Sequence, residues 1–190
     1  PSDVQAALVH HDPEAEAKVT AALLYRYAGE PYARLWERVK AMGPGELEEV
    51  IDRALEHLGA HDVPVRELEA VDYTFDLLMD YGAYREFKRH RMQTYIAQPP
   101  AVEHGYVVPP LVVDGSLEAD FRAAMGQAES AFRSLRSELP RIAQYLVTHA
   151  HKRRVLSKMN LRECYHLFNL RTGPDTHFSL AWVIQKAMES

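Results

Sequence analysis

The chain has 190 residues, of which 47% are hydrophobic and 26% charged, and its formal net charge at neutral pH is −5. This length suits one domain with a core large enough to fold without disulfides or metal ions, and it leaves no room for a second domain of ordinary size. The single cysteine excludes an internal disulfide, and no apolar run approaches the roughly 20 residues that cross a bilayer. We therefore expect one domain over residues 1–190 of a cytoplasmic protein that does not associate with membranes.

The N-terminal third is predicted to be helical after one short strand at residues 4–10. Asp12-Pro13 is typical of a helix start, because Asp caps free backbone amides and Pro suits the first helical turn. The spacing of apolar residues then predicts three helices that end at turns containing glycine or proline, over residues 13–27, 32–42 and 46–58.

The pattern changes in the middle of the chain. Apolar and polar residues alternate over residues 71–78, which predicts a half-buried strand, and a very polar helix is expected over residues 81–91. Residues 107–113 form an edge strand at best, because Pro109-Pro110 interrupts them. Asp114-Gly115-Ser116 supplies a turn and a cap for a helix to about residue 139. The remaining helices are predicted at residues 140–156, 161–170 and 176–188.

Two polar clusters could bind a ligand. Six of the seven residues from Arg85 to Arg91 are ionisable, which indicates either an anion site or a solvated helix face. On the predicted helix 161–170, Arg162, His166 and Asn169 share one stripe. Such a stripe can line a ligand groove, or its members can satisfy one another where two helices cross.

Metal binding and cysteine catalysis are not expected. Two histidine pairs have unsuitable settings: His149 and His151 do not share a helical face, and the pair at positions 57 and 61 is divided by the glycine of a helix end. Cys164 falls on the apolar side of its predicted helix, which is typical of a core residue rather than a nucleophile. We therefore predict no metal site.

Several motifs together resemble the flavin-dependent thymidylate synthases, the ThyX family. The tripeptide Arg89-His90-Arg91 resembles the Arg-His-Arg opening of the family signature, and Arg85-Glu86 stands where the family usually has Arg-Gln. Upstream, residues 68–75 resemble its Leu-Glu-His-x-x-Phe-Thr-Phe strand. Downstream, residues 160–162 resemble its Asn-x-Arg, and residues 169–171 resemble the Asn-Leu-Arg that carries its catalytic arginine. The order and spacing of these motifs agree across most of the chain.

The resemblance implies an α+β fold in which helices pack around a small, mainly antiparallel sheet, assembled as a homotetramer. It also implies FAD as cofactor, with NADPH and methylenetetrahydrofolate as co-substrates in the reductive methylation of dUMP to dTMP. Arg171 takes the catalytic role by this resemblance. The cofactor-binding positions are Arg89, His90, Arg91, Asn160, Arg162 and His166. The substrate-binding positions are Glu86, Arg89, Thr94 and Arg171. A cofactor that carries the redox step would explain why no protein nucleophile is needed.

The sequence departs from the family pattern mainly in the loop that binds substrate phosphate. The family's Ser, Asn-Glu, Ser and Arg-Tyr positions are held here by Thr94, Ile96, Ala97, Pro99, Ala101 and Val102. Ala70 replaces the histidine of the family's strand, and Gln144 stands where another substrate-binding arginine is expected. Glu86, in the place of a glutamine, disfavours a nearby phosphate. The contacts typical of FAD are therefore better preserved than those typical of dUMP.

Three functions remain open on sequence alone. The first is a divergent thymidylate synthase acting on dUMP or a related pyrimidine. The second is a catalytically degenerate module that binds flavin or serves as the structural partner of an intact copy. The third is a nucleic-acid binder that uses residues 88–91 and 152–154, which the net charge of −5 argues against. We expect a homo-oligomer or an assembly with an intact copy, and no nucleic-acid partner.

Overall fold

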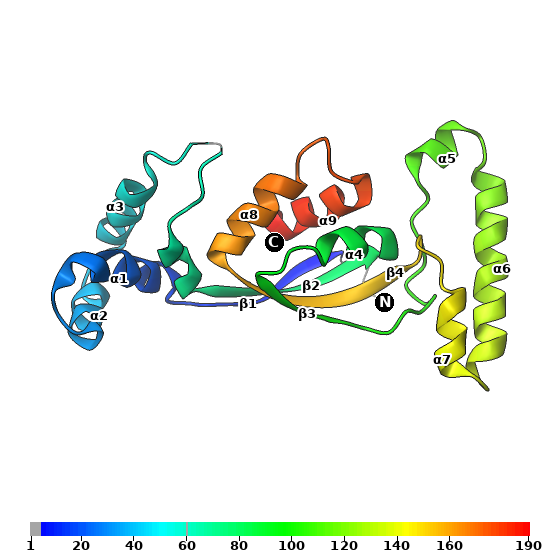
Figure 1. Ribbon diagram of the computed structural model, residues 1–190, viewed down its shortest axis with the longest axis horizontal. Helices are drawn as coiled ribbons and strands as arrows, with labels where there is room; N and C mark the ends of the chain where they lie inside the picture. The colour runs from blue at the N-terminus through cyan, green and yellow to red at the C-terminus, as the bar shows by residue number, and fades with distance from the viewer. Residues whose placement is uncertain (1–4, 60) are drawn as a thin grey trace.

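The computed structural model describes residues 5–59 and 61–190 and has an elongated shape with the sheet in its middle (Figure 1). The elements follow in the order β1 (Ala6–His11), α1 (Ala15–Ala28), α2 (Tyr32–Lys40), α3 (Pro44–Leu55), η1 (Arg66–Ala70), β2 (Asp72–Asp80), α4 (Tyr81–Phe87), β3 (Gln93–Ala97), α5 (Pro110–Asp114), α6 (Glu118–Arg136), α7 (Pro140–Ala143), η2 (Gln144–Leu146), β4 (Lys152–Asn160), α8 (Leu161–Arg171) and α9 (Phe178–Glu189). The predicted α+β class, with helices around a small antiparallel sheet, is confirmed.

Within the described residues, the four strands lie in the order β1-β2-β4-β3, and each neighbouring pair is antiparallel. The two central strands pair over their whole length, from Asp72 opposite Asn160 to Asp80 opposite Lys152. Helices α4, α8 and α9 cover one face of the sheet (Figure 1). Between the sheet and these helices lies the main core, which includes Phe75, Leu77, Val155, Leu167 and Ile184.

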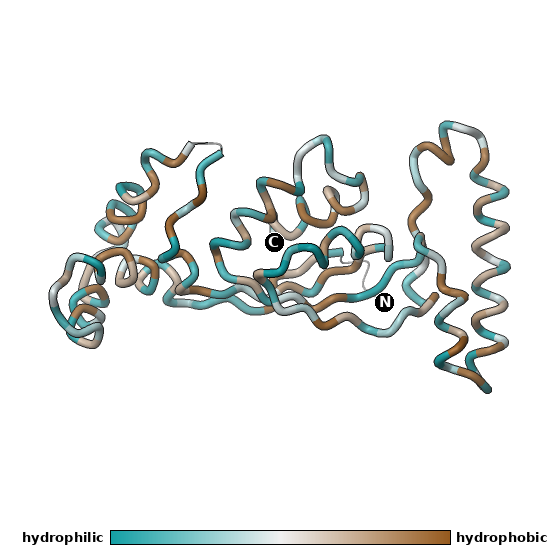
Figure 2. The backbone as a smooth tube through the Cα atoms, viewed as in Figure 1, coloured by the Kyte–Doolittle hydropathy of each residue, from teal (hydrophilic) through white to brown (hydrophobic). Residues whose placement is uncertain are grey.

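Smaller cores hold the two ends of the molecule. At the end formed by α1, α2 and α3, one cluster is built on Val19, Leu68 and Val71, and another on Ala21, Leu35 and Val39. At the other end, Val102, Phe132 and Ala143 hold α6 and α7 together. Hydrophobic and hydrophilic residues alternate along α6, as expected for a helix with one packed side (Figure 2).

Two of the helices over the sheet, α4 and α8, begin directly where the two central strands end. Asp80 accepts a hydrogen bond from the Ala83 amide at 2.9 Å and so caps α4, and Asn160 does the same for the Glu163 amide at 2.8 Å at the start of α8. Because β2 and β4 are antiparallel, these two helices start at opposite ends of the sheet and run back over the same face. The residues after α4 therefore meet the side chains of α8.

Two predictions about the strands are wrong. Residues 107–113 do not form an edge strand, since Pro110 opens the short helix α5, and the edges of the sheet are β1 and β3. The helix predicted over residues 140–156 stops after one turn, and the central strand β4 follows from Lys152. The predicted cap at Ser116 is also wrong, because this residue turns the chain with φ 57° and Leu117 precedes the helix. Among the described helices, none is long and apolar enough to cross a membrane.

Candidate functional site

A chain of four polar side chains joins α4, the turn after it and α8. Glu163 Oε1 lies 2.9 Å from Nδ1 of His90, and Nε of Arg171 donates to His90 Nε2 at 3.0 Å. The other end of the Arg171 guanidinium pairs with Glu86. His90 and Glu163 are both almost completely buried, whereas Glu86 and Arg171 keep about a fifth of their side chains exposed. These four hydrogen-bonded side chains thus extend from the interior to the surface.

The direction of these hydrogen bonds fixes the tautomer of His90. An arginine nitrogen can only donate, so Nε2 of His90 must accept the bond from Arg171. The imidazole proton then sits on Nδ1 and is donated to Glu163. While Arg171 is in this position, His90 is neutral, and Arg171 and Glu86 neutralise each other.

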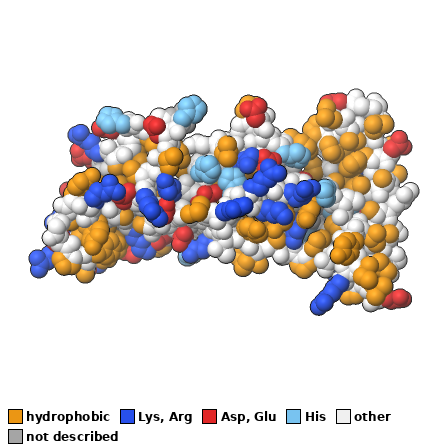
Figure 3. All heavy atoms as spheres, viewed as in Figure 1, with side chains coloured by type: hydrophobic (Ala, Val, Ile, Leu, Met, Phe, Trp, Pro, Cys, Tyr) orange, Lys and Arg blue, Asp and Glu red, His pale blue; other side chains and the backbone are white. Residues whose placement is uncertain are grey.

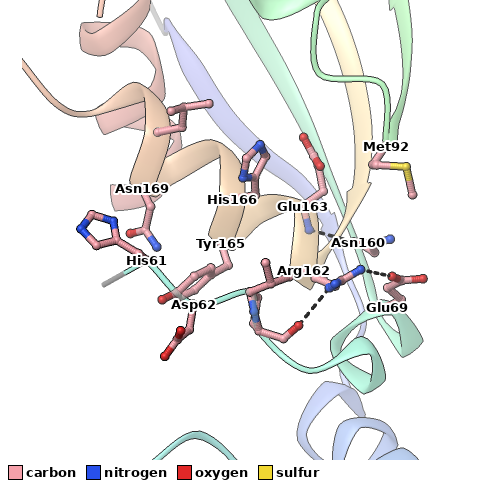
Figure 4. A pocket seen from close by; sticks show the side chains of 13 residues that line it. His61, Asp62, Glu69, Met92, Asn160, Arg162, Glu163, Tyr165, His166 and Asn169 are labelled. Carbon is pink, nitrogen blue, oxygen red and sulfur yellow. Dashed lines mark hydrogen bonds and ion pairs between the residues drawn. The ribbon is translucent and has the colours of Figure 1, made fainter. Parts of the chain in front are cut away.

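A cavity of about 650 Å³ adjoins these four side chains on the side of α8. Three predicted cofactor-binding residues, Asn160, Arg162 and His166, contribute to its wall together with Tyr165 and Asn169 (Figure 4). The opposite wall comes from the segment between α3 and β2, with His61, Asp62, Pro64 and Glu69. The ring of His166 lies 5.5 Å from that of His90, so the cavity wall approaches the buried part of the hydrogen-bonded series.

The cavity wall carries more negative charge than is typical of an anion-binding site. Nη1 of Arg162 pairs with Glu69 at 2.8 Å, and its Nε donates to the backbone oxygen of Pro64 at 3.0 Å (Figure 4). Asp62 and Glu163 also face this region, so three carboxylates accompany one guanidinium among the lining residues. Both arginines that the sequence marks as site residues on α8, Arg162 and Arg171, are therefore already paired with carboxylates of the same chain.

The other predicted site residues lie around this centre. Arg91 and Thr94 line a second hollow of about 310 Å³, which shares Met92 and Asn160 with the larger cavity. Thr94 is exposed and lies opposite Lys158, whereas its neighbour Gln93 points into the sheet's covered side and bonds Ser157 at 2.6 Å. The structure therefore joins Glu86, His90 and Arg171 directly but keeps Thr94 apart from them. Arg89 is exposed on the turn after α4.

Basic and aromatic side chains also meet beside α4. Arg153 from β4 lies 4.6 Å over the ring of Tyr84, and Lys88 lies 5.9 Å from the same ring. Residues from the two basic segments in the sequence are thus brought together, and Lys and Arg side chains gather over the middle of the face seen in Figure 3. The described residues contain no group of His, Cys, Asp and Glu that could hold a metal ion.

Cys164 lies on the inner side of α8 in the main core, as predicted from its position on the apolar face. Burial raises the pKa of its thiol to about 12, so the thiolate needed for nucleophilic attack is not formed at neutral pH. The sequence reasoning missed the two carboxylates that hold the site, Glu69 and Glu163. In the sequence, only their positions next to Ala70 and Arg162, in or beside the family-like motifs, pointed to them.

Comparison with known proteins places this geometry in a family context. Residues 7–190 match the family model described as thymidylate synthase complementing protein. A "UPF0159 protein" of Chlamydia muridarum is 34% identical over 90% of this chain and 33% of its own length. A flavin-dependent thymidylate synthase of Geobacter sulfurreducens is 29% identical over 87% of this chain and 72% of its own length. The chain spans about a third of the length of the UPF0159 relatives it matches.

Solved structures share the fold at low sequence identity. PolB from Streptomyces cacaoi, a UMP/dUMP methylase bound with 5-Br dUMP, has a TM-score of 0.72 and 18% identity over 100% of this chain and 89% of its own. ThyX from Helicobacter pylori, with FAD and dUMP, has a TM-score of 0.67 and 17% identity over 97% of this chain and 91% of its own.

Proposed function

Since the chain belongs to the thymidylate synthase complementing protein family, we propose that it acts as a flavin-dependent, thymidylate synthase-like protein on dUMP or a related pyrimidine. The reaction proposed is reductive methylation with FAD, NADPH and methylenetetrahydrofolate. The observation that carries this proposal is the meeting of Arg171, His90 and Glu163 beside a 650 Å³ cavity lined by Arg162 and His166. We also propose that residues 1–190 form one domain and that the protein works as a homotetramer.

The donor set of the cavity fits the ring system of a flavin better than its phosphates. Asn160, Arg162 and His166 offer hydrogen bonds, and the Tyr165 ring offers a flat apolar surface. The pyrophosphate finds no free guanidinium inside, because Arg162 is paired with Glu69, but the exposed Arg91 lines the neighbouring hollow that shares Met92 and Asn160 with the cavity. A bound flavin would supply the hydride chemistry that no protein side chain here provides.

Arg171 is proposed to stabilise negative charge on the pyrimidine ring. Its guanidinium is positioned by His90 on one side and Glu86 on the other, so it enters the reaction with a fixed orientation. Glu163 fixes His90 in turn through the Nδ1 proton. The roles of His90 and Glu163 are therefore to orient Arg171, and Arg162 and His166 serve cofactor binding.

An absorbance spectrum tests the proposal directly. We would record 300–550 nm on purified protein, with FAD added if the protein is colourless, and then titrate with dUMP. A bound flavin whose spectrum responds to dUMP supports the proposal, and formation of dTMP with NADPH and methylenetetrahydrofolate establishes the activity. An absence of flavin binding would refute it. Arg171→Ala should abolish methylation and keep flavin bound, because Arg171 is assigned to the pyrimidine.

A degenerate, flavin-binding or structural module is the second candidate function. Two observations favour it: the apolar residues in the phosphate loop of the sequence, and the pairing of both α8 arginines with carboxylates of the same chain. Flavin binding without any dUMP response, and turnover that appears only when an intact family member is added, would support this second function.

Light scattering on the purified protein would show whether the chain assembles as a tetramer.

A further inference from the structure

Glu86 holds a position from which it competes with ligands for Arg171. Its carboxylate pairs with the guanidinium across 85 positions of sequence, from the last turn of α4 to the last residue of α8. The pair is about four-fifths buried on both sides, so solvent screens it less than it screens the exposed pairs of this chain. An anion that approaches Arg171 must displace Glu86 and then lie close to its charge.

We propose that Glu86 determines the charge of the ligand that the site accepts: as an internal counter-ion of Arg171, it disfavours a phosphate at this end of the site and favours an uncharged pyrimidine nucleoside. The inference rests on the proposed function, because it assumes a pyrimidine ligand. A carbonyl oxygen of a neutral pyrimidine can share the guanidinium with Glu86, since an arginine has five N–H donors. A ligand phosphate near this end of the site brings like charge toward Glu86, and both arginines of α8 are already paired with carboxylates.

The hydrogen-bond directions extend this inference to His90. Arg171 Nε donates to His90 Nε2, so any ligand that pulls Arg171 away leaves that buried nitrogen without its hydrogen-bond donor. An anion that draws Arg171 away from Glu86 and His90 therefore breaks both contacts that orient the guanidinium, whereas a neutral ligand that leaves the Glu86–Arg171 pair in place keeps them.

Chemical modification tests the restraint on Arg171 without any pyrimidine. Phenylglyoxal modifies accessible arginines, and digestion followed by mass spectrometry gives the rate at each site. In Glu86→Gln we expect Arg171 to react about fivefold faster than in the wild type, with Arg162 as the internal reference. Glu103→Gln is the matched control, because Glu103 pairs with Arg136 at the far end of the molecule. An equal rate at Arg171 in wild type and Glu86→Gln would overturn the proposal.

Calorimetric titration with deoxyuridine and with dUMP tests the preference itself. The wild type should bind deoxyuridine more tightly than dUMP, and Glu86→Gln should shift the ratio of the two affinities toward dUMP by about tenfold. An unchanged ratio would overturn the role of Glu86 in specificity, even if Arg171 becomes more reactive. If neither protein binds either pyrimidine, the proposed function and the ligand preference both fail, and the modification rates still decide whether Glu86 restrains Arg171.

Discussion

Replacing Glu163 by alanine should destabilise the protein measurably. Glu163 and His90 are about 95% buried, and His90 donates its Nδ1 proton to the carboxylate at 2.9 Å. The substitution leaves the N–H of this buried imidazole without its carboxylate partner. A hydrogen bond to a charged group contributes about 1.5–3 kcal/mol, and we take about 2 kcal/mol as the expected loss. For a chain of this length, 2 kcal/mol lowers the Tm by roughly 4–8 °C.

Thermal unfolding followed by circular dichroism measures this loss. Glu163→Gln keeps an oxygen that can accept from Nδ1, so its Tm should lie between those of the wild type and the alanine variant. Glu189→Ala is the surface control: this carboxylate pairs with Lys186 in an exposed position, and its removal should cost less than about 0.5 kcal/mol.

A double-mutant cycle separates the hydrogen bond from other effects of the substitution. The cycle uses His90→Leu, Glu163→Ala and the double variant. Their unfolding free energies should give a coupling energy of about 1 kcal/mol or more if the two side chains are bonded. A coupling energy near zero, or a Tm of Glu163→Ala within 1 °C of the wild type, would refute the argument that this pair organises the site.

Three further results follow from the structure. Burial raises the pKa of Cys164 to about 12, so Ellman's reagent at pH 8 should not react with the native protein and should titrate one thiol after denaturation; a fast native reaction would contradict the burial. Burial also lowers the pKa of His151 below its usual 6.5, so the unfolded chain takes up this proton more readily and the free energy of unfolding should fall as the pH drops below about 6.5. Urea midpoints between pH 7.5 and 5 measure that fall, and His151→Gln should make it shallower. Arg162→Ala should lower the flavin content of the purified protein, because it removes a donor in the cavity wall; an unchanged content would remove Arg162 from the cofactor site.

The elements that sequence reasoning predicted well are those whose signals are local. Helix α4 follows the capping Asp80, and α8 follows Asn160, so their starts could be placed closely. Strand β4 was missed because its buried positions include Ser157, which hides the alternation of Val155 and Met159. Ser157 is accommodated inside because its hydroxyl bonds Gln93 of β3, and that partner is visible only when the sheet is assembled.

In the candidate site, too, the residue types could be predicted from the sequence, but the contacts between distant residues could not. The resemblance assigned Glu86 to the substrate, His90 to the cofactor and Arg171 to catalysis, and in the structure Arg171 contacts both Glu86 and His90. It could not indicate that Glu163 and Glu69 supply the counter-charges, since these contacts connect residues more than 70 positions apart. A motif specifies which residue types are present, whereas the pairing of charges depends on how α8 lies against the turn after α4 and against η1.

The two walls of the large cavity belong to parts of the protein with different hydrophobic cores. One wall includes Glu69 of η1, beside the cluster of Val19, Leu68 and Val71, and the other lies on α8 above the main core. Segments with separate cores can open with different free energies, which amide hydrogen exchange resolves. A ligand that touches both walls binds only when both segments are closed, so it couples their opening. Amides of α1 and α3 then exchange more slowly on binding, although no atom of the ligand reaches those helices.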